Sequence, residues 1–226
     1  MTTLRPEHLH DLRHSGLSDA TIAQMGVTSL DGMGLALGVH GPQSVQSAFA
    51  AHGYAIPYKN ASGAITSTRY KVFWTNPLDE QGKKKPKYLS AVGQESMLYL
   101  PPGLDAVLAK TDYLLVTEGE KKAAKAVQEG YPCVALAGVY MWADSRVRHI
   151  EKGMGKPLTY LSLPMPELMA LTKQRKVLIV FDSDSRTNAQ VQQARYLLKD
   201  ALLYHCASWV RIMDLPSGAM DEKKGL

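Results

Sequence analysis

Two apolar runs that each end in acidic residues constrain the fold of this chain most. Residues 113–117 (YLLVT) are followed by Glu118, and residues 177–181 (VLIVF) are followed by Asp182 and Asp184. Continuous apolar strands of this length are typical of a parallel sheet that is buried on both faces. In such sheets ligands bind outside the carboxyl ends of the strands, where all three carboxylates fall.

Three carboxylates that converge on one crevice repel each other unless a cation lies between them. Oxygen ligands suit a hard ion such as Mg²⁺, which takes one or two carboxylates and keeps water or substrate phosphates as its other ligands. In Asp182-x-Asp184 the alternate side chains point to the same side of the chain, so both can face one ion. The alternative is that Glu118 caps a helix and that the two Asp are turn residues. Both motifs together at strand ends favour the metal site.

The two acidic motifs also carry a family resemblance. TEGEKKA (residues 117–123) and FDSD (residues 181–184) resemble the Toprim domain of bacterial-type primases, type IA and II topoisomerases and some nucleases. In that family a Glu after the first strand and an Asp-x-Asp after the third bind Mg²⁺. Asp182 follows Glu118 by 64 positions, which leaves room for a helix, a strand, another helix and an insertion.

The first fifty residues read as mostly helical. One helix is expected to end near Gly16, a second to begin at Ser18 and stop at Gly26, and a third to span residues 42–52. Three histidines lie on the first of these helices, and we expect them to be solvated side chains and not metal ligands: His8, His10 and His14.

From Tyr54 the pattern changes to two strands joined by a glycine turn, followed by a lysine-rich loop. Basic residues are interleaved here with aromatic ones: Lys59, Arg69, Lys71, Lys83, Lys84, Lys85 and Lys87 with Tyr58, Tyr70, Trp74 and Tyr88. Such a mixture suits single-stranded nucleic acid, because cations follow phosphates and rings stack on bases. The alternative is a solvated hairpin with a charged loop, above all for the three consecutive lysines.

This segment extends the resemblance to the catalytic core of bacterial-type primases. The family positions are filled in order by Pro57, Gly63, Arg69, Pro86, Lys87, Tyr88, Ser90, Leu98 and Tyr99. Upstream, residues 12–27 resemble the helix pair that opens the core, and residues 210–222 resemble its fourth strand and acidic tail. The similarity covers nearly the whole chain and is nearest to primase domains of plasmid and phage replication proteins, which are often fused to a helicase.

The expected fold is therefore α/β. A Toprim domain over residues 111–226, with a roughly four-stranded parallel sheet flanked by helices, follows a basic α+β lobe over residues 54–110. A helical segment over residues 1–53 precedes both. Within the Toprim domain, residues 188–204 have the apolar stripe of a helix, and residues 208–213 form the last strand.

The resemblance implies roles for individual residues. Glu118 would be a metal ligand or general base near the incoming 3′ hydroxyl, and Asp182 and Asp184 would hold Mg²⁺ or Mn²⁺, with Asp221 as a further acidic candidate. The candidate nucleic-acid or nucleotide-binding residues are Lys59, Arg69, Lys71, Lys87, Tyr88, Lys121 and Lys122. The family commonly has an Asp where this chain has Lys122, and residues 138–164 look like an insertion.

The predicted activity is that of a nucleotidyltransferase, a DNA primase that makes short primers on single-stranded DNA in plasmid or phage replication. Its partners would be the template, nucleoside triphosphates and a replicative helicase, in cis or in trans. The net charge of +5 agrees with a polyanionic partner. We expect a soluble, cytoplasmic protein, because the sequence has no signal peptide and no long uncharged apolar run.

Other functions share parts of this pattern. A Toprim metal-dependent nuclease would use the same carboxylates to activate water, and a non-catalytic replication module would bind DNA and recruit a helicase. A topoisomerase needs a nucleophilic Tyr in a separate domain. A receiver-like fold also clusters Asp around Mg²⁺, although its acidic pair usually follows the first strand.

Overall fold

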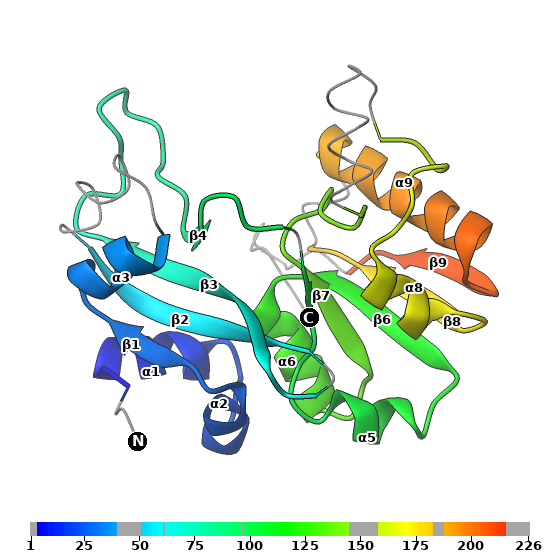
Figure 1. Cartoon of the computed structure of the whole chain (residues 1–226), viewed down its shortest axis with the longest axis horizontal. Coiled ribbons are helices and arrows are strands. Elements are labelled where there is room, and N and C mark those ends of the chain that lie inside the picture. The colour runs from blue at the N-terminus through cyan, green and yellow to red at the C-terminus, as the bar shows by residue number, and fades with distance from the viewer. Residues whose placement is uncertain are drawn as a thin grey trace. The chain divides into compact units, whose positions relative to one another are not determined.

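The computed structural model describes residues 4–39, 51–60, 62–95, 97–144, 158–182 and 188–215. Contacts within the chain divide it into two compact units, Met1–Gln94 and Glu95–Leu226. Figure 1 shows an antiparallel sheet in the first unit and a mostly parallel sheet in the second. The predicted division at residues 53/54 and 110/111 stays a prediction. The helical segment over residues 1–53 and the part of the basic lobe over residues 54–94 fall in the first unit, and the rest of that lobe, residues 95–110, falls in the second.

The first unit is built on a four-stranded antiparallel sheet of order β1-β2-β3-β4. Its elements are α1 (Pro6–His14), α2 (Asp19–Met25), β1 (Thr28–Leu30), α3 (Gly32–Val39), β2 (Ala51–Lys59), β3 (Ile65–Trp74) and β4 (Tyr88–Ser90). The long pair β2 and β3 is the predicted hairpin, and its turn contains Gly63 in the left-handed region at φ 80°.

The two faces of this sheet are covered by different helices. Side chains alternate along a strand, so His52 and Tyr54 of β2 lie on one face, where His8 of α1 contacts both rings. On the opposite face Leu35 and Ala36 of α3 form a core with Val72 of β3. Burial on both faces explains why β2 is buried from its third to its eighth residue.

Local signals account for the first helix pair. The Ser18 hydroxyl accepts a hydrogen bond from the backbone N–H of Thr21 at 3.2 Å and so caps α2. Gly26 ends α2 in the left-handed region at φ 70°, which glycine adopts without strain. The predicted start and stop of this helix are confirmed.

Helix α3 was not predicted, because its sequence GMGLALGV contains three glycines. Its apolar side chains compensate, since Leu35, Ala36 and Val39 are all buried. The helix predicted over residues 42–52 falls mainly outside the described residues. Its end is wrong, because Ala51 and His52 belong to β2.

The second unit is built on a five-stranded sheet of order β5-β7-β6-β8-β9. Its elements are β5 (Leu98–Tyr99), α5 (Leu104–Leu108), β6 (Tyr113–Glu118), α6 (Glu120–Gln128), β7 (Cys133–Leu136), α8 (Pro166–Thr172), β8 (Lys176–Val180), α9 (Ala189–His205) and β9 (Trp209–Met213). Four strands are parallel and β5 is an antiparallel edge. The predicted four-stranded parallel sheet flanked by helices is confirmed, as are the last helix and last strand.

The connections of this sheet run in two directions from its centre. The chain crosses from β6 through α6 to the neighbouring β7, and from β8 through α9 to β9 on the other side. Because such crossovers are right-handed, the two helices cover opposite faces of the sheet, as Figure 1 shows. The central strands β6 and β8 therefore flank the point at which the strand order reverses.

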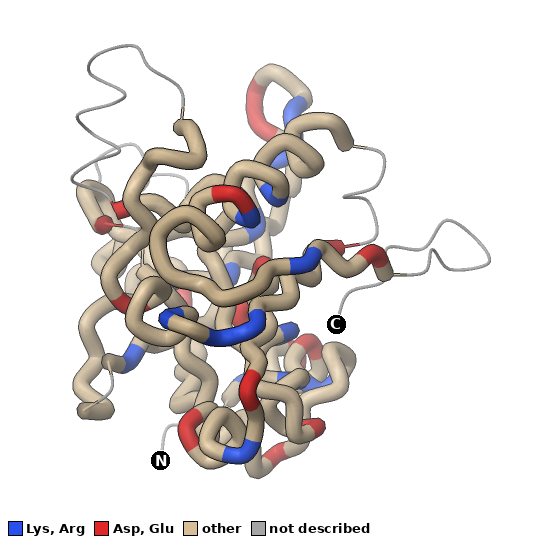
Figure 2. Tube along the Cα trace, turned by 90° about the vertical axis from the view of Figure 1, so that its right-hand side faces the viewer, with Lys and Arg blue, Asp and Glu red and all other residues tan. Residues whose placement is uncertain are grey.

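Charge is spread over both units. Figure 2 shows acidic and basic positions interspersed along the described trace. Among the helices that the structure describes, none is both long and apolar enough to cross a lipid bilayer.

Candidate active site and nucleic-acid interface

The two acidic motifs lie at the carboxyl ends of neighbouring parallel strands. Strands β6 and β8 pair in register, with Val116 beside Ile179. Glu118 is the last residue of β6, and Asp182 follows β8 by two residues. Both residues therefore reach the same edge of the sheet, at the strand-order reversal where open α/β sheets bind their ligands. The juxtaposition expected for Glu118 and Asp182 is present, and their catalytic and metal-binding roles stay predictions.

A sharp turn directs helix α6 back along the sheet immediately after Glu118. Gly119 makes this turn at φ 95°, a backbone conformation that residues other than glycine rarely adopt. Its backbone N–H donates a hydrogen bond to the carbonyl oxygen of Leu136 at 3.3 Å. Helix α6 begins at the next residue. The turn places the lysines of the first helical turn close to the strand ends.

One of these lysines binds the second acidic motif. The Nζ of Lys122 donates a hydrogen bond to Oδ1 of Asp182 across 60 positions of sequence. Both side chains are about three-quarters buried, with exposed fractions of 26% and 25%. Lys122, predicted to bind nucleic acid, thus contacts a carboxylate of the candidate metal site.

The residues at this edge fit a hard divalent cation. Carboxylate oxygens of Glu118 and Asp182 are the ligand type that Mg²⁺ prefers, and two carboxylates lie within the one or two that it usually takes from protein. Asp182 already attracts a cation, the Lys122 ammonium group. Asp184 and Asp221 lie outside the described residues, so their roles also stay predictions.

One further acidic residue near this edge of the sheet was not predicted from the sequence. Glu120 opens α6 and is only 1% exposed. Its charge lies near Tyr99 of β5, whose pKa is raised mainly by burial and further by Glu120. The sequence feature that could have revealed Glu120 is the second glutamate in Glu118-Gly119-Glu120. A glutamate at that position is equally well explained as a favourable negative charge in the first turn of a helix.

The first unit carries cations and rings on one strand pair. Lys71 of β3 lies opposite Tyr88 of β4. The Nζ of Lys71 lies 4.7 Å from the centre of the Tyr88 ring, and the guanidinium carbon of Arg69 lies 5.2 Å from it. We call Arg69, Lys71 and Tyr88 the β3–β4 patch, and all three are half-buried.

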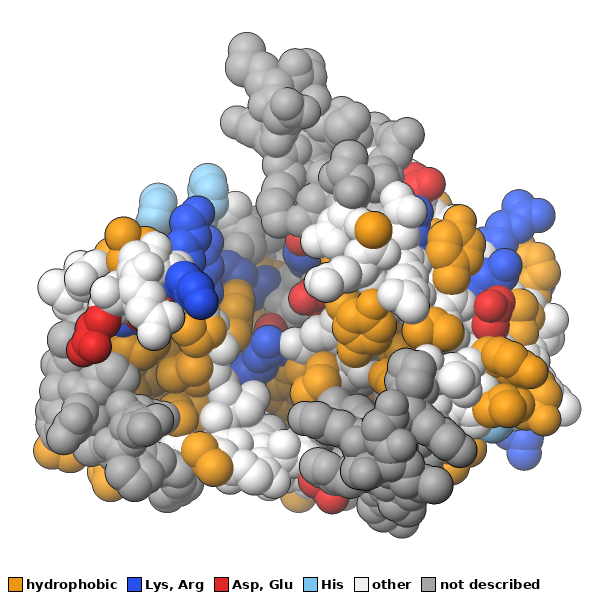
Figure 3. All heavy atoms as spheres, turned by 90° about the horizontal axis from the view of Figure 1, so that it is seen from above, with side chains coloured by type: hydrophobic (Ala, Val, Ile, Leu, Met, Phe, Trp, Pro, Cys, Tyr) orange, Lys and Arg blue, Asp and Glu red, His pale blue; other side chains and the backbone are white. Residues whose placement is uncertain are grey.

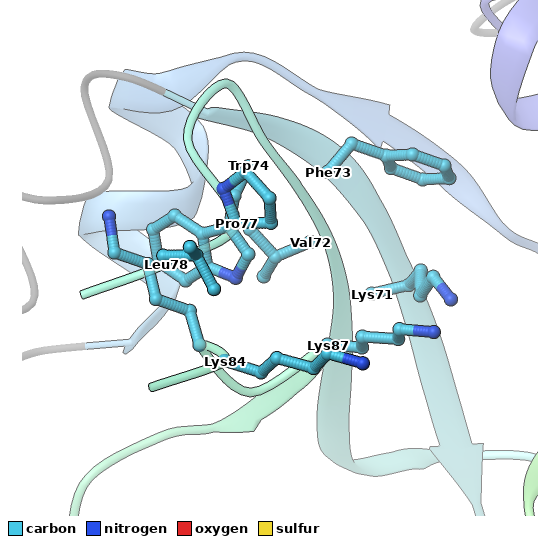
Figure 4. A pocket seen from close by; sticks show the side chains of 9 residues that line it. Lys71, Val72, Phe73, Trp74, Pro77, Leu78, Lys84 and Lys87 are labelled. Carbon is cyan, nitrogen blue, oxygen red and sulfur yellow. The ribbon is translucent and has the colours of Figure 1, made fainter. Parts of the chain in front are cut away.

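A surface pocket of about 430 Å³ adjoins the β3–β4 patch. It is lined by Lys71, Val72, Phe73, Trp74, Pro77, Leu78, Lys84, Lys85 and Lys87. Figure 4 shows Trp74, Pro77 and Leu78 grouped on its wall, with the side chains of Lys71 and Lys87 extending to the same side. The Trp74 indole N–H donates to the Pro86 carbonyl oxygen at 2.8 Å, which holds the ring in place.

This combination of rings and ammonium groups suits a single-stranded nucleic acid or a nucleotide. Figure 3 shows Lys and Arg side chains beside hydrophobic ones on the face of the first unit turned to the viewer. Trp74 and Lys85, which the structure adds to the candidate set, lie 5.2 Å apart from ring centre to Nζ. Both were named in the basic and aromatic stretch of the sequence, although not among the candidate binding residues.

The remaining candidates lie elsewhere. Lys59 is at the end of β2, where its Nζ donates to the Gln24 carbonyl oxygen at the end of α2. Lys121 lies on α6 in the second unit beside Lys122. Neither belongs to the β3–β4 patch, and their binding roles stay predictions.

The fold described above is similar to that of solved bacterial primase catalytic cores. The E. coli primase catalytic core aligns over 94% of this chain and 66% of that chain, with a TM-score of 0.55 and 19% identity. A DNA primase domain from Pseudomonas aeruginosa aligns with a TM-score of 0.54 and 17% identity, over 93% of this chain and 64% of that chain. A DnaG primase catalytic domain bound to ssDNA has a TM-score of 0.51 and 20% identity, with the same coverages.

The chain belongs to the family described as a domain of unknown function, DUF3854, whose model matches residues 105–226. Among curated proteins no sequence matches this chain. The chain spans about two thirds of the length of the solved primase structures to which it is similar.

Proposed function

We propose that this chain is the catalytic core of a DNA primase, a nucleotidyltransferase that makes short primers on single-stranded DNA. The observation that carries the proposal is the position of Glu118 and Asp182 at the ends of neighbouring parallel strands in a primase-core fold. The substrates would be nucleoside triphosphates and a single-stranded template.

Glu118 and Asp182 would hold Mg²⁺ or Mn²⁺, together with Asp184 by the pattern of the sequence. A divalent ion at such a site lowers the pKa of the attacking 3′ hydroxyl and neutralises charge on the triphosphate and on the departing pyrophosphate. Lys122 pairs with Asp182 in this structure, and once a divalent ion displaced it, its ammonium group would add a positive charge next to the place where phosphate oxygens would lie. Lys121 and Lys122 would in this way contribute to nucleotide binding.

The β3–β4 patch would hold the template. Its cations would follow the phosphate backbone, and the ring of Tyr88, with that of Trp74 in the adjoining pocket, would offer surfaces on which bases stack. Such contacts do not discriminate between sequences, as a primase core that moves along a template requires.

The experiment that tests this function is primer synthesis with labelled nucleotides on single-stranded DNA, in the presence of Mg²⁺ or Mn²⁺. We expect oligonucleotide products from the unaltered protein and at least a hundredfold fewer from Glu118→Gln and Asp182→Asn, the scale of loss when charge stabilisation is removed from an active site. The matched control is Asp112→Asn. Asp112 pairs with Lys176 at 2.7 Å at the opposite ends of the same two strands.

The ion pair between Lys122 and Asp182 favours a second candidate function, a DNA-binding replication module without catalysis. In that case the ammonium group permanently takes the place of a metal ion. The same assay separates the two functions, because a module of this kind would bind single-stranded DNA through the β3–β4 patch but the unaltered protein itself would yield no oligonucleotide.

We place this activity in plasmid or phage replication, next to a replicative helicase in the same chain or on a separate one. The support is the similarity of the sequence to primase domains of such systems. Affinity capture with purified replicative helicases of plasmid and phage systems tests the proposed partner, and retention of none of them by the immobilised chain would contradict it.

A further inference from the structure

Two histidines and a glutamate in the first unit bring three metal-binding atoms together. The ring nitrogens of His8 and His52 and a carboxylate oxygen of Glu7 all lie within 4.8 Å of one another. His8 Nε2 lies 2.8 Å from His52 Nδ1, which lies 3.9 Å from Glu7 Oε1. These residues come from the start of α1 and the start of β2, more than forty positions apart in sequence.

His8 is held more firmly than a solvated histidine would be, and the expectation that it is solvated is wrong. The side chain is fully buried, and its ring stacks on Phe73 of β3 with the ring centres 5.2 Å apart. Long-range packing between α1 and the sheet causes this burial, which no local pattern in α1 reveals.

A second hydrogen bond orients the His8 ring. His8 Nδ1 lies 2.7 Å from the hydroxyl oxygen of Ser29, which also accepts the backbone N–H of Arg5 at 2.9 Å. With Nδ1 held by Ser29, Nε2 faces His52 and Glu7. Metal-binding histidines show this arrangement, in which the ring nitrogen that is not bound to the metal donates to an oxygen nearby.

We propose that Glu7, His8 and His52 form a binding site for Zn²⁺ or a similar transition-metal ion. Two imidazoles and one carboxylate are a known three-ligand set for zinc, and they leave a fourth position for water. Imidazole ligands also favour zinc, copper and nickel over Mg²⁺, so the ion differs in kind from the one proposed for Glu118 and Asp182.

The surroundings of the cluster suit an exchangeable ion. The side chains of His52 and Glu7 are 34% and 48% exposed, so an ion can enter from solvent. Burial lowers the pKa of His8, which favours the neutral ring that binds a metal. Two nitrogens bound to one tetrahedral zinc lie about 3.3 Å apart, so the rings need to separate by only about half an ångström.

A metal at this cluster would fasten α1 to the edge of β2. The ion binds only when both elements are in place, so it stabilises the folded first unit in proportion to its occupancy. The proposal concerns the first unit alone and does not depend on primer synthesis.

Zinc binding to the full chain, measured by isothermal titration after removal of metals with a chelator, tests the proposal. We expect one zinc ion per chain and a dissociation constant at least about tenfold higher for His52→Asn and Glu7→Gln. Ser29→Ala, which leaves all three ligands in place, is expected to weaken binding by roughly tenfold. Cobalt provides an independent readout, because its visible absorption reports nitrogen and oxygen coordination in a site of low symmetry.

The matched control is the double change His10→Ala and His14→Ala. These two exposed rings lie on the same helix with their centres 6.0 Å apart, and they are the other histidine pair that could attract a metal there. The proposal holds if the control binds zinc like the unaltered chain while His52→Asn and Glu7→Gln bind it more weakly. It is overturned if the control loses the zinc, if His52→Asn binds as tightly as the unaltered chain, or if no variant and no parent binds.

Discussion

Lys122 is the residue whose environment most affects the candidate active site. A lysine on Asp182 neutralises the carboxylate that a divalent ion would need, so the two cations compete. The position also marks a departure from the primase pattern, in which an acidic residue is common. The chemistry of this site therefore depends on whether the ammonium group yields to the metal.

Lys122→Met is expected to tighten Mn²⁺ binding by roughly two- to fivefold. The reason is that the ion must otherwise break the Lys122–Asp182 ion pair, or share Asp182 with Lys122, and this pair is worth about 0.5–1 kcal/mol. Titration with Mn²⁺ followed by electron paramagnetic resonance measures the change directly. Lys125→Ala serves as the control, because Lys125 pairs with Glu129 on its own helix. Equal affinities of Lys122→Met and the unaltered chain would show that Asp182 is not a ligand.

A single glycine sets the close approach of β2 and β3. A Cβ atom on Gly53 would clash with the backbone carbonyl oxygen of Lys71, which cannot move without disturbing the strand pair. We expect Gly53→Ala to destabilise the protein by about 1–3 kcal/mol, the usual cost of overpacking. Urea unfolding measures this loss of stability, with Gly138→Ala as the control. At Gly138 the added Cβ meets only the Met141 side chain, at an ordinary contact distance. A Gly53→Ala midpoint equal to that of the control would contradict the packing described.

At the scale of elements, the strand pair β3 and β4 carries the proposed template contacts. Lys71→Ala should weaken binding of an oligodeoxythymidylate and lower the slope of log affinity against log salt by roughly 0.7, as expected for one lost phosphate contact on a single strand. Fluorescence anisotropy at several salt concentrations gives both values. Lys110→Ala, an exposed lysine of the second unit, is the charge-matched control. A change of the same size in Lys110→Ala would show that the weaker binding of Lys71→Ala comes from the lower net charge alone, and this would contradict a specific contact.

The helix pair at the start of the chain contains an ion pair that is sensitive to acid. Arg13 donates two hydrogen bonds of 2.7 Å to Asp19, and these lower the pKa of Asp19 below its ordinary value. A carboxylate with a depressed folded pKa stabilises the fold above its unfolded pKa near 3.9, and this contribution is lost as the pH falls through the folded value.

We therefore expect Asp19→Asn to make the thermal midpoint less dependent on pH between about 5 and 3. The effect should be small, because both side chains are exposed and solvent screens the pair. Thermal melts over this pH range measure it, with Glu80→Gln as an exposed control. Parallel pH profiles for Asp19→Asn and the unaltered chain would contradict the role of this pair.

For the whole molecule, the sequence predicts those features that local patterns determine. The apolar runs before Glu118 and Asp182 are long and uniform, and they identify β6 and β8 and the strand ends without further information. Capping residues do the same for α2. Helix α3 could not be predicted, because its glycines oppose a helix and its stability comes from packing on β3.

Contacts between residues that are far apart in the sequence could not be predicted from it. The Lys122 pair with Asp182 spans 60 positions, and the environment of His8 depends on Ser29, His52 and Phe73 from three separate strands. In both cases the polar residues are of types that are ordinarily solvent-exposed, and only the tertiary fold gives them their partners.

The central claim is that a divalent ion binds at the reversal point of the parallel sheet, between the ends of β6 and β8. Anomalous diffraction from crystals soaked in Mn²⁺ tests it most directly. The account predicts a peak within about 2.2 Å of carboxylate oxygens of Glu118 and Asp182, with Lys122 displaced from Asp182. A map with Lys122 still on Asp182 and no peak at this edge of the sheet would contradict it.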